Sequence, residues 1–291
     1  MFRPIHRPLV VLMTLALAVA SAVTTLPLLA QPAAQPGTVT LEWLGHNAWR
    51  FTSPTGKVVL ANPFVTNPDS PISVDRIDRA DLILVTDGHS DEVGQTIEIA
   101  QNTGARVMAG SWGLGGWFID MGLPATQVSR TSPGGRDRSD GITVRVLNGI
   151  HGSDIGRPTS TTPSGGIAAS FMVTFENGWS IFYSGSSAAT QDMAMWAQMY
   201  KPDAAVVQLS GGREPMDFAM VVKLLMTDNP NLNAVFPGHH RFVQGPGQTT
   251  VAEAQAAMDA MGTGLTITEP VPGVSYLSLD IDCSPAVIRA G

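Results

Sequence analysis

The segment from residue 80 to 110 joins two buried-strand patterns through a helical one. The runs LILVT and ARVMAG are rich in apolar and β-branched residues, and VGQTIEIAQNTG between them has helical periodicity that Gly104 ends. Strands connected through a helix lie parallel in one sheet, and the helix covers a face of that sheet. This segment therefore predicts an α/β fold.

The other segments repeat this mixture of strands and helices. The opening TVTLEWLGHNAWRFTSPTGKVVLANPF alternates apolar and polar residues around a Pro-Thr-Gly turn, which indicates antiparallel strands. Strand patterns follow at GITVRVL, AASFMVTFENGWSIFYSG, DAAVVQL and NAVFPGHH, and helical patterns at AATQDMAMWAQMY, PMDFAMVVKLLMT and TTVAEAQAAMDAMG. Such a mixture predicts sheets flanked by helices on their outer faces.

Composition excludes one class of function. The chain has 291 residues, 44% of them hydrophobic, which is enough for a large buried core. Its formal charge of −7 gives no basic surface for a phosphate backbone, and no run of Lys or Arg provides one. We therefore expect no nucleic-acid partner.

The N-terminus predicts export. Arg3 and Arg7 precede a charge-free apolar run, so residues 1–30 are typical of a secretory signal, with the Pro-rich residues 31–37 as a spacer. The alternative is an uncleaved membrane anchor, because the run could span a bilayer. Either way we expect one folded domain over residues 38–291, periplasmic or secreted, without an internal disulfide because Cys283 is the single cysteine.

Histidines gather at the ends of predicted strands. His89, His151 and His239 each follow a strand pattern within a few residues, and His89 lies in the acidic stretch TDGHSDEVG. A single histidine is more often structural than a ligand. Ligands nevertheless collect at the carboxyl ends of strands in α/β sheets, so three such residues favour a metal or catalytic site.

These residues carry a resemblance to a known family. The stretches LGHNAWRF, ADLILVTDGHSDEVG, GIHGSD, IFYSGSS, PDAAVVQLSGG and AVFPGHH follow the order and spacing of the metallo-β-lactamase superfamily, most closely its lactonase-like metal-dependent hydrolase branch. The resemblance covers nearly all of residues 38–282. It implies a four-layer αββα sandwich with a metal site at one edge of the two sheets.

The resemblance also implies metal-ligand positions. The family's H-x-H-x-D-H motif falls on Asp87, His89, Asp91 and Glu92, its next metal histidine on His151, its bridging aspartate on Ser186 and its last histidine on His239. Three of these seven positions depart from the pattern, namely Asp87, Glu92 and Ser186. The implied first site is Asp87, His89 and His151, and the implied second is Asp91, Glu92 and His239, with only the Ser186 hydroxyl between them.

The substituted ligands still suit a cation. Two departures exchange imidazole for carboxylate, so the set supplies three negative charges where the usual family set supplies two. Oxygen donors shift preference toward harder ions, so Zn²⁺, Mn²⁺ and Fe²⁺ all remain open. We expect one bound ion rather than two, because the bridging carboxylate is missing.

The expected function is metal-dependent hydrolysis of a small ester, lactone, amide or phosphoester. Asp91 is the leading candidate to orient the attacking water and move its proton. His46 resembles a family position near the site and is a candidate substrate contact; a structural strand-end histidine is the alternative. The glycine-rich stretch SWGLGGWFIDMG is either core or an apolar wall of the site. The second hypothesis is a non-catalytic binding protein with the same fold.

Overall fold

The computed structural model describes residues 37–278 except 158, 160 and 211, and all of these lie in one compact unit. The predicted signal, most of the spacer and Cys283 lie outside the described residues. Within the described ranges, no helix is long and apolar enough to cross a membrane.

The strands form two sheets. The first has the order β13 (Ser275–Leu277), β1 (Thr40–Trp43), β2 (Trp49–Thr52), β3 (Val58–Ala61), β4 (Leu82–Val85), β5 (Arg106–Ala109), β6 (Val128–Arg130). The second has the order β12 (Ala234–Gly238), β11 (Ala204–Gln208), β10 (Ser180–Tyr183), β9 (Ala169–Thr174), β8 (Ile142–Asn148), β7 (Arg136–Ser139). β1 to β3 are antiparallel, as predicted, while β3, β4 and β5 run parallel.

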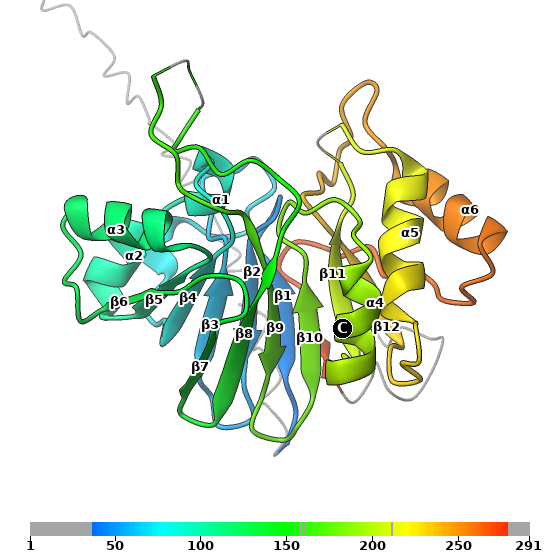
Figure 1. The fold of residues 1–291 in the computed structure, drawn as a ribbon, viewed down its shortest axis with the longest axis horizontal. Coiled ribbons are helices and arrows are strands. Elements are labelled where there is room, and N and C mark those ends of the chain that lie inside the picture. Colours follow the sequence, from blue (N-terminus) through cyan, green and yellow to red (C-terminus); the bar gives the residue numbers. More distant parts are fainter. Residues whose placement is uncertain (1–36, 158, 160, 211, 279–291) are drawn as a thin grey trace, which may run out of the picture. The chain divides into compact units, whose positions relative to one another are not determined.

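Helices cover the outer face of each sheet. They are α1 (Ser90–Val93), α2 (Thr96–Thr103), α3 (Trp112–Asp120), α4 (Asp192–Tyr200), α5 (Pro215–Leu225) and α6 (Val251–Ala260), with a 3₁₀ turn at Val74–Arg76. Figure 1 shows α2 and α3 on the side of the first sheet and α4, α5 and α6 on the side of the second. The αββα sandwich predicted from the sequence is confirmed.

Three hydrophobic clusters fill the spaces between these four layers. The middle cluster lies between the sheets and includes Trp43, Trp49, Phe171 and Phe236. A second cluster joins the first sheet to α2 and α3, and a third joins the second sheet to α4, α5 and α6. Each sheet is therefore buried on both faces, which explains why its central strands read as continuous apolar runs.

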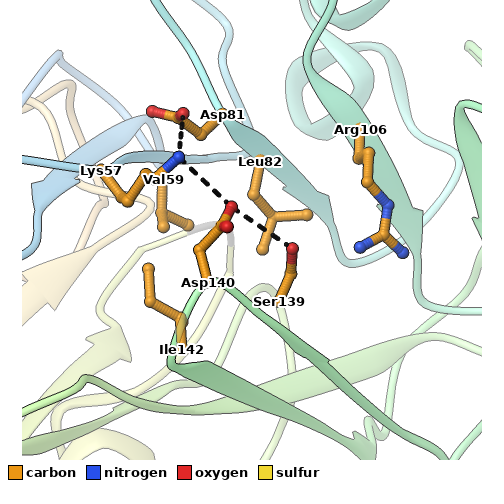
Figure 2. Close-up of a pocket in the computed structure, with 8 residues that line it drawn as sticks. All are labelled: Lys57, Val59, Asp81, Leu82, Arg106, Ser139, Asp140 and Ile142. Atoms are coloured by element: carbon orange, nitrogen blue, oxygen red, sulfur yellow. Dashed lines mark hydrogen bonds and ion pairs between the residues drawn. The ribbon is translucent and has the colours of Figure 1, made fainter.

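Polar contacts join the two sheets at the edge where β4 and β8 begin. Lys57 Nζ lies 3.2 Å from Asp81 Oδ1 and 3.3 Å from Asp140 Oδ2. Lys57 and Asp81 precede strands of the first sheet, and Asp140 lies in the β7–β8 turn of the second. Figure 2 shows these side chains around a small pocket that Leu82, Arg106 and Ile142 also line. The pairs link the sheets at the edge opposite the one where the predicted site residues lie.

The stretch SWGLGGWFIDMG forms a helix that the sequence does not predict. Ser111 caps α3 by accepting a hydrogen bond from the Leu114 amide, and Leu114 and Phe118 are buried against the first sheet. Gly115 is required where α3 meets β6, since a Cβ there would lie 2.7 Å from Arg130 Cγ. The segment is mainly core, although Trp112 is exposed at its start.

Candidate metal centre

Loops from both sheets bring the predicted site residues to one edge of the sandwich. Asp87 and His89 follow β4, and Asp91 lies in α1, which Figure 1 shows beyond the ends of the strands. His151 follows β8 and His239 follows β12, both in the second sheet. With His46, which lies between β1 and β2, these side chains fall into two groups, each with three potential metal-ligand atoms within 4.8 Å of one another.

The first group is Asp87, His89 and His151, the set expected for the first site. His89 Nδ1 lies 3.3 Å from Asp87 Oδ1, and the His89 and His151 rings meet edge to face with centroids 5.0 Å apart. Asp87 is buried and accepts hydrogen bonds from the Thr86 hydroxyl and the His89 amide. Burial raises the pKa of its carboxyl to about 7 despite these hydrogen bonds.

The second group is His46, Asp91 and His239. Asp91 Oδ2 lies 3.3 Å from His239 Nε2 and 3.8 Å from His46 Nε2, and the two rings have centroids 4.1 Å apart. Burial and the neighbouring His239 lower the pKa of His46 to about 3, so this imidazole is neutral at pH 7. Partial burial would raise the pKa of Asp91, but hydrogen bonds with His239 and Glu92 hold it below its usual range.

Glu92 and Ser186 belong to neither group. Ser186 Oγ donates a 2.6 Å hydrogen bond to Glu92 Oε1, and the Asn47 amide lies 3.5 Å from the same oxygen. Glu92 is fully buried, and this burial, with the charges of Asp87 and Asp91, raises its pKa well above the usual value. The two residues that replace a family histidine and the family's bridging aspartate are therefore paired with each other.

Asn47 organises the second group, although the sequence gives no reason to select it. Its Oδ1 accepts a hydrogen bond from the His239 amide, and its carbonyl accepts one from the Tyr183 hydroxyl. A Cβ at Gly238 would lie 2.9 Å from Asn47 Oδ1, so glycine is needed for this approach. The buried Asn47 thus connects the loop after β1 to the end of β12.

His240 points away from the centre. Its buried ring packs on Trp43 with centroids 5.5 Å apart, and its nitrogens contact Glu269 at 3.1 Å and Gln244 at 2.7 Å. From the sequence, an extended segment would aim only one histidine of the pair inward, and the family's spacing selects His239. The backbone at His239 is left-handed (φ 50°) rather than extended, and it is the His239 ring that lies 3.3 Å from Asp91 Oδ2.

Arg213 is a second residue that the sequence does not single out. Its Nε donates to Gln208 Oε1 at 3.3 Å, and its Nη2 donates to the Ser186 carbonyl at 3.1 Å. Partial desolvation, His89 and then the charge of Arg213 lower the pKa of His151 to about 4. In the described part of the chain, no carboxylate lies within ion-pair distance of this guanidinium.

The donor set fits a divalent cation. Each group combines one carboxylate with two imidazoles, which is a donor set of catalytic Zn²⁺ and non-haem Fe²⁺. The Nδ1 atoms of His46 and His239 are buried and, among the described residues, have no hydrogen-bond partner, unlike the nitrogens of a packed structural histidine. The crowded carboxylates Asp87, Asp91 and Glu92 also favour a positive charge between them.

Comparisons with known proteins identify the family of the chain. The model of the β-lactamase superfamily domain matches residues 52–268. A UPF0173 metal-dependent hydrolase of Rubrobacter xylanophilus is 32% identical over 193 residues, which cover 65% of this chain and 78% of the relative. One from Cupriavidus necator is 30% identical over 259 residues, which cover 83% of this chain and 87% of that protein.

Solved structures show the same fold. Igni18, a metallo hydrolase of Ignicoccus hospitalis, superposes with a TM-score of 0.69 at 20% identity, over 82% of this chain and 98% of its own. An isothiocyanate hydrolase from Delia radicum gut bacteria superposes with a TM-score of 0.62 at 14% identity, over 81% of this chain and 98% of its own. Because the family model spans most of the described residues, the chain belongs to the metallo-β-lactamase superfamily.

Proposed function

We propose that this chain is a metal-dependent hydrolase whose cation is held by Asp87, His89 and His151. The observation that carries the proposal is the meeting of these three side chains, from loops of both sheets, with all ligand atoms within 4.8 Å. Three protein ligands leave a position for water, as in catalytic metal sites. The curated relatives described as metal-dependent hydrolases support the same class of reaction.

When bound, such a cation lowers the pKa of a coordinated water and polarises the carbonyl or phosphoryl group under attack. The residues of the chain then hold the water and move its proton. Asp91 stays ionised and lies beside the first group, so its carboxylate accepts the proton of the attacking water and returns it to the leaving group. His239 Nε2 lies 3.3 Å from this carboxylate and orients it beside the first group.

The rim of the site supports a small substrate with apolar and anionic parts. Ile150 immediately precedes His151, and Phe242 and Val243 follow the His239–His240 pair; all three are exposed. Arg213 supplies a positive charge next to His151. An ester, lactone, amide or phosphoester fits these features. We also propose that the protein acts in the periplasm or outside the cell, which the charge-free apolar run of residues 8–30 supports.

A metal-loading experiment tests the function. Purified protein is stripped with a chelator, reloaded with Zn²⁺, Mn²⁺ or Fe²⁺, and assayed on lactones, carboxylic esters, amides and phosphodiesters. We expect stoichiometric metal and turnover with at least one ion, and in Asp87→Asn and His151→Ala loss of turnover and of the ion that the first group holds. Metal binding without turnover on any substrate would instead support a non-catalytic binding protein.

A further inference from the structure

We propose that His46, Asp91 and His239 form a second cation site, in which His46 takes the ligand position that the sequence pattern gives to Glu92. The Glu92–Ser186 pair then supports this site from behind without contacting the ion. The inference rests on the metal centre of the proposed function, but not on the reaction that it catalyses. It implies that the chain holds two cations although the usual bridging carboxylate is absent.

The distances suit a shared ion. Two ligands that each lie 2.0–2.1 Å from a tetrahedral zinc ion are separated by about 3.3 Å. Asp91 Oδ2 lies 3.3 Å from His239 Nε2 and 3.8 Å from His46 Nε2. The three atoms thus need only small movements to enclose an ion. One carboxylate and two imidazoles repeat the donor chemistry of the first group.

The backbone holds both histidines in an unusual conformation. His46 has φ 51° and His239 has φ 50°, both in the left-handed region that non-glycine residues rarely occupy. The His46 carbonyl accepts hydrogen bonds from Trp43 Nε1 at 3.0 Å and from the His240 amide at 3.3 Å. Such backbone strain is typical of functional sites, and here it directs both imidazoles at one carboxylate.

A structural role does not explain these two rings. His240, the adjacent structural histidine, contacts a partner through each of its ring nitrogens. His46 and His239 instead both place Nε2 toward the same oxygen, Asp91 Oδ2. Paired imidazoles that share one carboxylate and little else are better explained as cation ligands than as core polar residues.

Glu92 is a poor ligand in this arrangement. Its Oε1 accepts the 2.6 Å hydrogen bond from Ser186 Oγ, with the Asn47 amide at 3.5 Å. The same oxygen lies 3.7 Å from His239 Nε2, but Glu92 belongs to neither group of ligand atoms that all lie within 4.8 Å of one another. Glu92 is therefore a positioning residue, because it anchors α1 and so aims the neighbouring Asp91 at the two histidines.

Metal titration of chelator-treated protein distinguishes His46 from Glu92. We would measure Co²⁺ and Zn²⁺ binding by calorimetry, and the Co²⁺ visible spectrum, for wild type, His46→Asn, Glu92→Gln and His151→Ala. Asparagine tolerates a positive φ, so His46→Asn removes the imidazole with little change to the backbone. Glu92→Gln keeps the size of the side chain. Circular dichroism and Tm confirm that each variant is folded.

We expect wild type to bind two ions. His46→Asn should weaken one of them by more than the 10- to 100-fold that is typical of a lost outer-sphere partner, while Glu92→Gln should keep both. Two ions of wild-type affinity in His46→Asn, or loss of an ion in Glu92→Gln alone, would overturn the inference.

Other outcomes separate the two proposals. A single ion that is lost in His151→Ala and unaffected in His46→Asn overturns the second site but leaves the proposed function intact. A single ion with the opposite response supports the second site and overturns the ligand set of the proposed function. Wild type that binds neither metal overturns both.

Discussion

The adjacent residues His239 and His240 have the same side chain and different surroundings. His239 lies 3.3 Å from Asp91 at the metal centre, whereas His240 is buried beside Trp43 and Glu269. From sequence alone, replacing His240 is expected to be nearly silent. The structure changes that expectation, because the His240 ring fills space in the fold and has hydrogen-bond partners.

We therefore predict opposite effects for the two alanine variants. His239→Ala should lose metal affinity and activity with a nearly unchanged free energy of unfolding. His240→Ala should keep metal binding but lose about 1–3 kcal/mol of stability, since it leaves buried polar partners unsatisfied. Urea unfolding of the metal-free proteins, paired with metal titration, checks both. Equal metal loss in the two variants would contradict the register of the β12 end.

Arg213 provides a prediction about specificity that rests on the proposed hydrolase activity. Arg213→Ala should raise KM roughly tenfold or more for substrates that carry a carboxylate or phosphate, because a hydrogen bond to a charged group contributes about 1.5–3 kcal/mol. Neutral substrates should be affected little. Steady-state kinetics on a matched charged and neutral pair measures this, and Arg213→Lys shows whether charge alone is sufficient. Equal changes for both substrates would place Arg213 in a purely structural role.

The site residues differ in how readily they can be selected from the sequence. His89, His151 and His239 can be selected because each follows a strand pattern, and the structure brings Asp87 to the first two. Asn47 and Arg213 act through backbone carbonyls, amides and distant side chains. Such contacts have no local signature. The proximity of His46 to Asp91 likewise depends on how β1 and α1 are placed by the sheet.

At the scale of the element, the short helix α1 carries Asp91 and Glu92 and depends on one glycine. Gly94 ends α1 with φ 47°, and a Cβ there would overlap the Pro63 carbonyl oxygen and the backbone of Phe64. Gly104 ends α2 with φ 75°, but nothing lies within 4 Å of the position of its Cβ. Substitution of Gly94 would therefore cause a steric clash as well as backbone strain, whereas substitution of Gly104 would cause backbone strain alone.

We predict that Gly94→Ala shifts α1 and weakens metal binding, whereas Gly104→Ala lowers stability by about 1 kcal/mol and leaves the metal centre unchanged. The loss of about 1 kcal/mol is the cost of placing a non-glycine residue in the left-handed region when its Cβ meets no neighbouring atom. Tm and metal affinity of both variants provide the measurement. Unaltered metal binding in Gly94→Ala would show that α1 can move without moving Asp91.

Elements with clear periodicity were predictable, and those without it were not. The pattern VGQTIEIAQNTG and its final glycine predict α2, and the Asn-Gly pair predicts the β9–β10 turn. α3 was not predicted, because its three glycines lower helix propensity and its stability comes from packing Leu114 and Phe118 on the first sheet. Short strands such as β6 and β13 form only because a neighbouring strand is in place.

At the scale of the whole molecule, the candidate metal centre joins loops of the two sheets. In the first group, Asp87 and His89 come from the first sheet and His151 from the second. In the second group, His46 and Asp91 come from the first sheet and His239 from the second. A bound cation therefore fixes one edge of the sandwich, whereas the Lys57–Asp140 ion pair links the sheets at the opposite edge (Figure 2).

These two links should contribute very differently to stability. A cation that binds only the folded state at 100 times its Kd adds about 2.7 kcal/mol, which for a domain of this size raises Tm by about 5–10 °C. Lys57→Met should leave Tm almost unchanged, because partly exposed ion pairs contribute little. Calorimetric scans of chelated and metal-loaded protein, with and without Lys57→Met, make the comparison.

His151→Ala should abolish much of the metal-induced rise, since it removes the ligand by which the first group reaches the second sheet. If the metal-induced rise in Tm persists in His151→Ala and disappears in Lys57→Met, the ion binds at the edge of Lys57 and not at the edge of His151.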